Sequence, residues 1–292
     1  MAHVDTYQLV TDRITTALEA GTVPWHRPWN PSGGMPRNLV SGKLYRGINP
    51  LLLSLGSAYQ SPWWCTFNQA RERGGCVRKG EKGSLVIFWK LPTRQEVDGA
   101  DADTPEYERR APLLKHYWVF NSEQCDGLTT PPTEEYQPNE WDPIPLCESI
   151  VAGMPQRPAT KTDSRQAFYC PALDYVGMPL LSQFESPEAY YATYFHELVH
   201  STGHPRRLDR SLSLEVQPFG SPDYSKEELV AEFGAAYLCG VAGIWPAVTS
   251  NSAAYIAGWL SKLRGDKKLL VMAAAQAQKA ADFILAVQHD AE

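Results

Sequence analysis

Apolar residues near the start of the chain recur every three or four positions, which is the spacing of one face of a helix. The residues that share this spacing are Tyr7, Val10, Ile14 and Leu18. They predict an amphipathic helix over residues 6–20, which Gly21 ends. Two further short helices are predicted at Leu51–Leu55 and Phe67–Arg73.

Two short runs of β-branched and aromatic residues, Leu85–Trp89 and Tyr117–Phe120, predict strands. A long acidic loop over residues 92–112 separates them. Residues 129–145 (TTPPTEEYQPNEWDPIP) are rich in proline and acid and poor in aliphatic side chains, which is typical of a linker. We therefore expect a mixed α/β domain over residues 1–130, a linker over 131–145 and a second domain over 146–292.

The second domain is predicted to be mainly helical. Phe168–Cys170 and Tyr175–Met178 could form a hairpin. Ser186 is a favourable N-cap with Pro187 at the first helical position, and this helix should run to Gly203. Three later helices are expected over residues 225–240, 251–263 and 267–287. The fold class is therefore α+β.

Charge is distributed unevenly along the 292 residues. The chain has 27 Lys and Arg against 33 Asp and Glu, a net charge of −6. Residues 1–90 contribute +6 and residues 91–292 contribute −12, so a polyanion partner would bind the first part. No stretch approaches the ~20 apolar residues of a membrane span, and no secretory signal is evident, so a cytoplasmic location is expected. The six cysteines form no C-x-x-C pair, which argues against a zinc ribbon.

The segment HELVHSTGH, which begins at His196, carries the chemistry of the second domain. On a helix, His196 and His200 lie on one face, close enough for both imidazoles to bind one zinc ion. Glu197 lies beside them, where it can accept a proton from the attacking water. This pattern arises by chance in about one chain per hundred of this composition. A solvated helix face is the alternative, but the neighbouring aromatic residues would bury this helix.

A catalytic zinc ion usually has a third protein ligand, and three residues could supply it. Glu228 and Glu232 share one face of the next predicted helix, and His204 would lie about 80° around the first helix from His196. We favour Glu228 as the ligand, with Glu232 orienting a histidine, although the two roles could be exchanged. Glu228 could instead complete a capping box with Ser225. Two histidines and one glutamate accept several divalent ions besides Zn²⁺.

Tryptophan and basic residues are interleaved in the first domain, as they are in proteins that bind single-stranded DNA. Trp63 and Trp64 are adjacent, so one of them should be exposed, whereas Trp89 and Trp118 lie in predicted strands and should be buried. The residues predicted to contact DNA are Trp63, Trp64, Arg46, Arg78, Lys79 and Lys82. The basic, glycine-rich GGCVRKGEKG segment is not a Walker A loop, which disfavours nucleotide hydrolysis.

The segments HELVHSTGHPRRLDR and EELVAEFGAAYL resemble the zincin-like peptidase domain of ArdC-type antirestriction proteins, which is of the gluzincin kind. ITTALEAGTVPWHRPW, YRGIN, WWCTFNQARERGGCVRKGEKG and VFNSEQCDGL are similar to the single-stranded-DNA-binding domain of the same family. The resemblance implies that His196, His200 and Glu228 hold zinc, and that Glu197 is the base. It also implies a plasmid-borne protein that protects incoming DNA from host restriction, with a restriction protein as a potential peptidase target.

Two other functions remain open at the level of sequence. The chain could bind DNA and mask it sterically, with a metal site that is structural or vestigial. It could also be a toxin-like peptidase whose basic domain delivers it. The residue that would stabilise the oxyanion is not defined by the sequence, although Tyr224 is one candidate.

Overall fold

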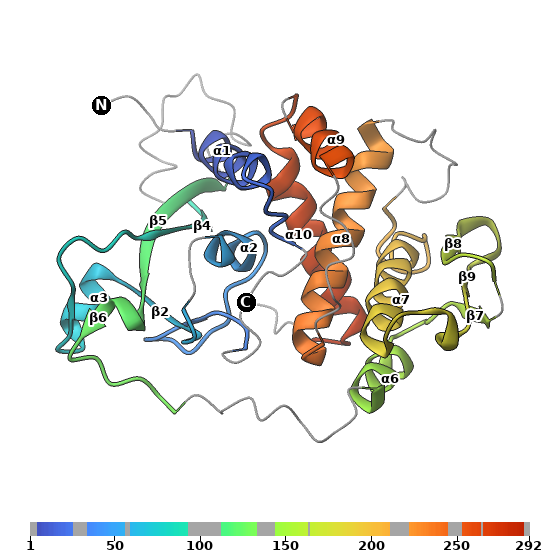
Figure 1. Cartoon of the computed structure of the whole chain (residues 1–292), viewed down its shortest axis with the longest axis horizontal. Coiled ribbons are helices and arrows are strands. Elements are labelled where there is room, and N and C mark those ends of the chain that lie inside the picture. The colour runs from blue at the N-terminus through green and yellow to red at the C-terminus, as the bar shows by residue number, and fades with distance from the viewer. Residues whose placement is uncertain are drawn as a thin grey trace.

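The computed structural model describes residues 5–25, 34–55, 59–92, 112–132, 144–162, 164–210, 222–244, 253–263 and 265–288. The predicted acidic loop and most of the predicted linker lie outside these residues. A sheet with short helices forms one side of the molecule, long helices form the middle, and a small second sheet lies at the far side (Figure 1). The α+β prediction is therefore confirmed.

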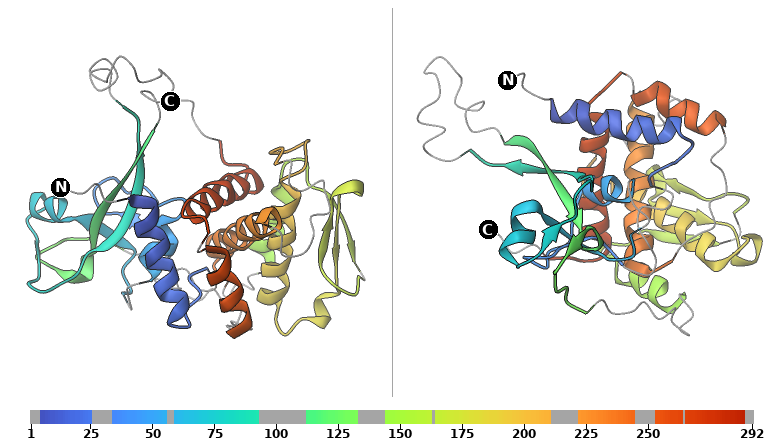
Figure 2. Two further views of the ribbon diagram at one scale, coloured as in Figure 1. Left: turned by 90° about the horizontal axis from the view of Figure 1, so that it is seen from above. Right: turned by 60° about the vertical axis from the view of Figure 1, so that its left-hand side comes forward.

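The N-terminal part is built around a four-stranded sheet in the order β1-β2-β5-β4. Its strands are β1 (Arg37–Asn38), β2 (Trp63–Thr66), β5 (Leu113–Asn121) and β4 (Ser84–Lys90). β4 and β5 form an antiparallel ribbon that projects from the sheet (Figure 2). The remaining elements are α1 (Thr6–Glu19), α2 (Asn49–Ser54), α3 (Phe67–Glu72), β3 (Cys76–Val77), η1 (Ser122–Gln124) and β6 (Cys125–Asp126).

The C-terminal part combines a three-stranded sheet with long helices. The sheet has the order β7-β9-β8, and its strands are β7 (Ala159–Thr162), β9 (Tyr175–Met178) and β8 (Phe168–Cys170). The helices are α6 (Ile144–Gly153), α7 (Pro187–Ser201), α8 (Pro222–Ala242), α9 (Ala253–Leu263) and α10 (Leu269–Ile284), with the short turns η2 (Pro171–Leu173) and η3 (Leu181–Gln183). Within the described ranges, no helix combines the length and the apolar character that crossing a membrane requires.

Most predicted helices and strands are present, and their ends differ by a few residues. The Ser186 hydroxyl accepts a hydrogen bond from the Ala189 amide at 3.2 Å, so α7 has the predicted cap. α6, β7, β2 and the two-residue strands β1, β3 and β6 were not predicted. α6 buries Cys147, Ile150 and Val151, whose spacing is that of one face of a helix. The helix was not predicted because the proline-rich segment before it suggested that the linker continued to residue 145.

α7 and α8 pack very closely. An added Cβ at Gly234 of α8 would lie 2.7 Å from a methyl group of Val199 in α7, so only glycine allows this approach. Phe195 and Leu198 on α7 and Phe233 on α8 are fully buried around this contact. The close approach fixes where side chains of α8 meet those of α7.

The two parts of the chain share one hydrophobic core. α1 packs against α9 and α10, and Val10, Ile14 and Leu18 belong to the same buried cluster as the C-terminal helices. The Trp25 ring lies against Phe233, with ring centroids 5.2 Å apart. The first helix therefore packs with the C-terminal part of the molecule, although it begins the chain (Figure 1).

Candidate metal centre

Three side chains from two helices converge at the α7–α8 contact. Nε2 of His196 and Nε2 of His200 are 3.1 Å apart. The Glu228 carboxylate, from α8, lies 3.6 Å from Nε2 of His196 and 3.5 Å from Nε2 of His200. All three side chains are partly exposed, so the cluster is open to solvent on one side. Among the described residues, this is the one group of His, Cys, Asp or Glu side chains close enough to share a metal ion.

These distances fit a divalent ion of the size of zinc. Ligand atoms about 2.0–2.1 Å from a tetrahedral zinc ion are separated by about 3.3 Å. The two imidazole nitrogens are 3.1 Å apart, and each lies 3.5 or 3.6 Å from one of the two oxygens of the Glu228 carboxylate, which is close to that value. Three lone-pair donors held so close together, with a carboxylate among them, form a site that favours a cation.

Of the alternatives for the third ligand, the geometry brings only Glu228 to both histidines. α8 begins at Pro222, so Ser225 lies inside the helix and not at its cap, and the Glu228 carboxylate points to α7. His204 lies beyond the end of α7, where its Nδ1 accepts a hydrogen bond from the Arg206 amide at 3.2 Å. Glu232 does not belong to the cluster.

Glu227, which was not among the predicted site residues, contacts His200 in the way expected of an orienting carboxylate. Its carboxylate is buried and lies 3.5 Å from Nδ1 of His200, on the side of the ring away from the cluster. Arg210 holds this carboxylate through two contacts, of 2.7 and 3.2 Å. A hydrogen bond at Nδ1 fixes the orientation of the ring and leaves Nε2 for a metal.

Arg210 also ties the turn after α7 to the end of that helix. Its guanidinium donates to the Val199 carbonyl at 2.9 Å and to the Thr202 hydroxyl at 2.7 Å. A cation that binds the last carbonyls of a helix is favourable because the negative end of the helix dipole lies there. Arg210 therefore both positions the Glu227 carboxylate and binds polar groups at the C-terminal end of α7.

A second arginine fixes the other side of the same turn. The Arg207 side chain is almost wholly buried and forms an ion pair with Asp174, which follows η2. It also donates to the Ser201 carbonyl at 2.7 Å and to the Tyr169 hydroxyl at 3.1 Å. The segment that follows the histidines is thereby fastened to the β7-β9-β8 sheet.

The electrostatic environment of the cluster is strongly acidic. Burial lowers the pKa of His200, but hydrogen bonds to Glu227 and Glu228 outweigh burial and raise that pKa to about 10. Burial raises the pKa of Glu228, but contacts with both histidines outweigh it and hold that pKa well below its usual range. Burial likewise opposes a lowered pKa for Glu227, which His200 and Arg210 hold down. The surroundings therefore favour positive charge at the centre, whether a proton or a metal ion supplies it.

Glu197 lies next to His196 on α7 and is 9% exposed. Its negative charge contributes to the raised pKa of His200, which places the carboxylate near the cluster. It makes no hydrogen bond or ion pair with the residues that the structure describes. A carboxylate in this position can accept a proton from a water molecule beside the three donors.

The tryptophans of the N-terminal sheet are arranged in the reverse of the predicted way. Trp63 and Trp64 are only 8% and 3% exposed, because β2 is covered on both faces by different hydrophobic clusters. Neither can stack on a base, so their assignment as DNA contacts is wrong. Trp89 and Trp118, which we expected in the core, are 45% and 48% exposed on the projecting β4–β5 ribbon.

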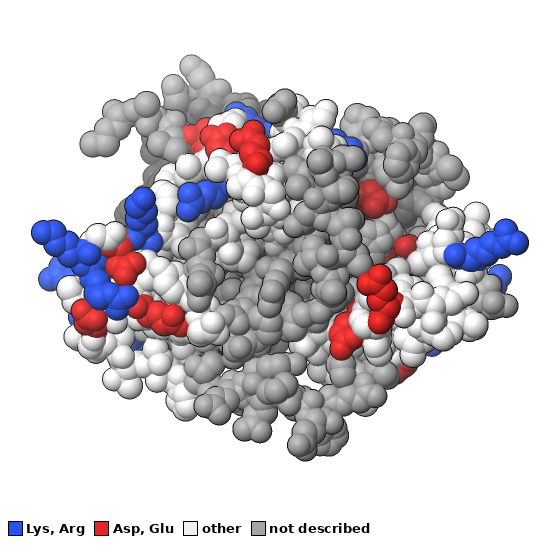
Figure 3. Space-filling view, in the orientation of Figure 1, with Lys and Arg blue, Asp and Glu red and all other residues white. Residues whose placement is uncertain are grey.

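The four predicted DNA-contacting cations differ in how they are engaged. Arg46 forms an ion pair with Asp282 of α10, and Arg78 pairs with Glu81 at 2.9 Å. Lys79 and Lys82 are exposed and form no ion pair with any described residue. Lys and Arg side chains gather at the edge of the molecule near α3 and β6, with some acidic side chains among them (Figure 3).

Comparisons with known families assign both parts of the chain. Residues 4–120 match the N-terminal domain of anti-restriction factor ArdC. Residues 149–276 match a zincin-like metallopeptidase family. The second match contains the three converging side chains and Glu197.

Similar proteins include two described as DNA primase TraC, both from Escherichia coli. They are 38% and 35% identical over 97% of this chain, which spans only 27% and 20% of their lengths. The uncharacterized protein y4eC of Sinorhizobium fredii is 36% identical over 99% of this chain and 94% of its own length.

Two solved structures of the antirestriction protein ArdC from plasmid R388, one Mn(II)-bound and one metal-free, resemble the whole chain. Each is 40% identical, with a TM-score of 0.75, and the match covers 96% of this chain and 97% of that one. Identity at this level over nearly the full length of both chains confirms the resemblance inferred from the motifs. The chain therefore belongs to the ArdC family of antirestriction proteins.

Proposed function

We propose that this protein protects incoming plasmid DNA from host restriction by combining single-stranded DNA binding with a metal-dependent peptidase site. The observation that carries the enzymatic half is the convergence of His196, His200 and Glu228 at separations that suit a divalent ion. The family supports a divalent metal, since one ArdC structure was solved with Mn(II). We assign Zn²⁺ as the working metal because two imidazoles and one carboxylate are a typical catalytic zinc set.

The residues of the site have separate tasks in peptide hydrolysis. His196, His200 and Glu228 would hold the metal, which supplies Lewis acidity and lowers the pKa of water. Glu197 takes a proton from the attacking water and returns it to the amine that leaves. Glu227 and Arg210 hold the His200 ring so that its Nε2 faces the metal. The target we propose is a host restriction protein.

The DNA-binding half of the proposal is supported by the match to the ArdC N-terminal domain and by the charge of residues 1–90. Exposed lysines and arginines at the α3 and β6 edge would follow the phosphates. Phe88 and Tyr117, exposed and stacked on one another on one face of the β4–β5 ribbon, would provide stacking surfaces.

Replacing the proposed base should separate metal binding from hydrolysis. Glu197→Gln should keep a full complement of metal and lose peptide hydrolysis by about 10²–10⁴-fold, because the carboxylate moves the proton but does not ligate. The measurements are metal content by mass spectrometry, cleavage of an unfolded protein substrate, and plasmid transfer into a restricting host. Undiminished cleavage by this variant would refute the role of Glu197. Full protection of the plasmid without cleavage would favour steric masking by DNA binding.

The third ligand can be tested against a matched glutamate on the same helix. Glu228→Gln should reduce metal affinity by at least about tenfold, because it removes a charged ligand from the cluster. Glu232→Gln should leave metal affinity near that of the wild type. Titration of the metal-free protein with Zn²⁺ against a competing chelator gives both values. Equal losses in the two variants, or a larger loss for Glu232→Gln, would exclude Glu228 as the ligand.

A proton on His200 should stabilise the metal-free protein in a defined pH window. The pKa of His200 is raised to about 10 from an ordinary value of 6.5, so its contribution is complete below pH 6.5 and is lost as the pH rises toward 10. The melting temperature of chelator-treated protein should therefore fall between pH 7 and pH 10. His200→Gln should show a smaller fall over the same range. Parallel pH profiles for the two proteins would contradict the raised pKa.

Lys79 and Lys82, which form no ion pair with any described residue, provide the test of phosphate contact. Replacing Lys79 and Lys82 together by Gln should weaken binding to a single-stranded oligonucleotide and reduce the slope of log affinity against log salt by about 1.4. Fluorescence anisotropy at several salt concentrations measures both quantities. Lys161→Gln, on the distant β7 strand, is the control and should behave as the wild type. An unchanged slope in the double variant would remove these lysines from the DNA contact.

A further inference from the structure

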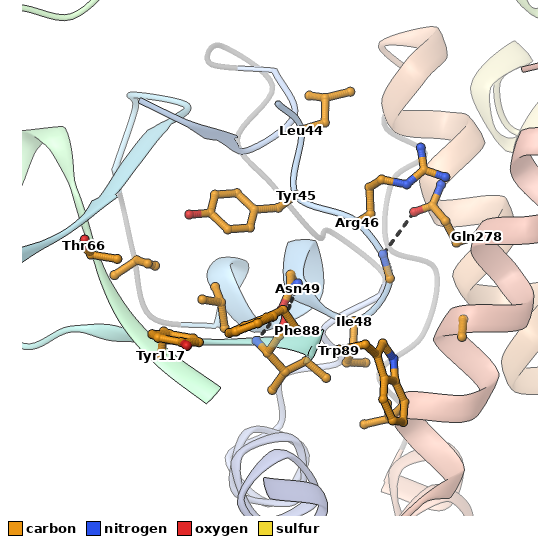
Figure 4. Close-up of a pocket in the computed structure, with 16 residues that line it drawn as sticks. Leu44, Tyr45, Arg46, Ile48, Asn49, Thr66, Phe88, Trp89, Tyr117 and Gln278 are labelled. Carbon is orange, nitrogen blue, oxygen red and sulfur yellow. Dashed lines mark hydrogen bonds between the residues drawn. The ribbon is translucent and has the colours of Figure 1, made fainter. Parts of the chain in front are cut away.

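A pocket of about 600 Å³ lies where the N-terminal sheet meets α10. Its lining comes from three places: the segment 44–49, the β4–β5 ribbon, and the side of α10 that carries Gln278 (Figure 4). This volume is in the usual range for sites that bind small organic groups. These residues belong neither to the metal centre nor to the group of Lys and Arg side chains near α3 and β6.

Aromatic rings form one wall of the pocket. Phe88 on β4 and Tyr117 on β5 stack with their centroids 4.6 Å apart and remain 38% and 42% exposed (Figure 4). Tyr45 also lines the pocket. Large aromatic rings so exposed beside a concave surface are unusual in a folded protein, and they offer flat faces to a ligand.

Positive charge flanks these rings. Arg46 is the one charged residue in the lining, and its side chain is half exposed although it pairs with Asp282. Lys115 lies directly opposite Phe88 in the β4–β5 register, is exposed, and forms no ion pair with a described residue. Rings that can stack on bases, with cations beside them, are the combination that holds a single nucleic-acid strand.

The two side-chain amides of the lining, Asn49 and Gln278, are already engaged within the protein. Asn49 both donates to the Ile87 carbonyl at 2.8 Å and accepts from the Ile87 amide at 2.7 Å. Gln278 accepts from the Gly47 amide at 3.1 Å and donates to Asp282 at 3.1 Å. With both amides occupied, neither can read the edge of a base, and the rings of Phe88 and Tyr117 offer their faces to any base.

We propose that this pocket holds one or two unpaired bases of single-stranded DNA by stacking on Phe88 and Tyr117, with Arg46 and Lys115 near the flanking phosphates. The proposal rests on the single-stranded DNA binding proposed above and gives it a location. Because stacking requires only a ring face, binding at this site tolerates any base. A duplex is excluded because its bases are already stacked and paired.

The test compares leucine substitutions on the two faces of the ribbon by fluorescence anisotropy with a labelled single-stranded oligonucleotide. Phe88→Leu and Tyr117→Leu keep an apolar side chain but remove the ring, and each should weaken binding by about 5-fold to 150-fold. Trp118→Leu is the matched control, since Trp118 is 48% exposed and pairs with Leu85 on the opposite face. Tyr117→Phe keeps the ring and should retain nearly the full DNA affinity of the wild type. The wild type should bind oligo(dT) and oligo(dA) with similar affinity.

The outcomes separate this proposal from the DNA-binding function itself. If the wild type binds DNA and both leucine variants match it, the pocket assignment is wrong while DNA binding stands. If the wild type does not bind single-stranded DNA, both the pocket assignment and the proposed DNA-binding function are wrong. Binding of a hydrophobic dye is measured on the same variants. If the leucine variants no longer bind the dye but keep the DNA affinity of the wild type, the pocket binds an apolar ligand and the proposal is overturned.

A second measurement needs no variant. An oligonucleotide containing 5-iodouracil, irradiated with the unmodified protein, should crosslink to the peptides that contain Phe88, Tyr117 or Tyr45. Crosslinks confined to peptides elsewhere in the chain would overturn the proposal even if the leucine variants fail to fold.

Discussion

The metal centre depends on one packing contact, between Val199 of α7 and Gly234 of α8. The contact lets the two helix backbones approach so closely that a carboxylate from one reaches two imidazoles on the other. A side chain at Gly234 would force Val199 aside, and the separations of 3.5 and 3.6 Å between Glu228 and the histidines would have to increase. The chemistry of the site therefore begins with a residue that carries no functional group.

Charge balance explains why this cluster suits a divalent ion. Three carboxylates lie close to the histidines: Glu197, Glu227 and Glu228. Arg210 neutralises Glu227 through two contacts, which leaves two carboxylates without a fixed cation. A divalent ion supplies the two missing positive charges, whereas a proton on His200 supplies only one. Removing Arg210 would therefore disturb the metal as well as the turn, because a third carboxylate would be left uncompensated.

The sequence could predict those parts of the site that are local. The four-residue spacing of His196 and His200 lies within one helix, so their convergence follows from helix geometry alone. Choosing among Glu227, Glu228 and Glu232 required the rotation of α8 relative to α7, which tertiary packing determines. The two tryptophan pairs were misassigned for the same reason. A strand pattern does not show that β2 is covered on both faces while the end of the β4–β5 ribbon is not.

The two parts of the chain are held together by direct contacts. The Tyr237 hydroxyl on α8 donates to the Gly47 carbonyl at 2.8 Å, and Gln278 on α10 accepts from the Gly47 amide. Gly47 has a φ of +60°, which favours glycine and lets the chain turn between these two helices. Helix α8 therefore carries Glu228 of the metal centre and also anchors the segment that lines the aromatic pocket. Since α1 and Trp25 also pack on the C-terminal helices, separating the two parts at the predicted linker would expose part of this core. The aromatic pocket proposed to bind DNA and the candidate metal centre are consequently held in one framework, and a partner bound to one would lie at a fixed place relative to the other.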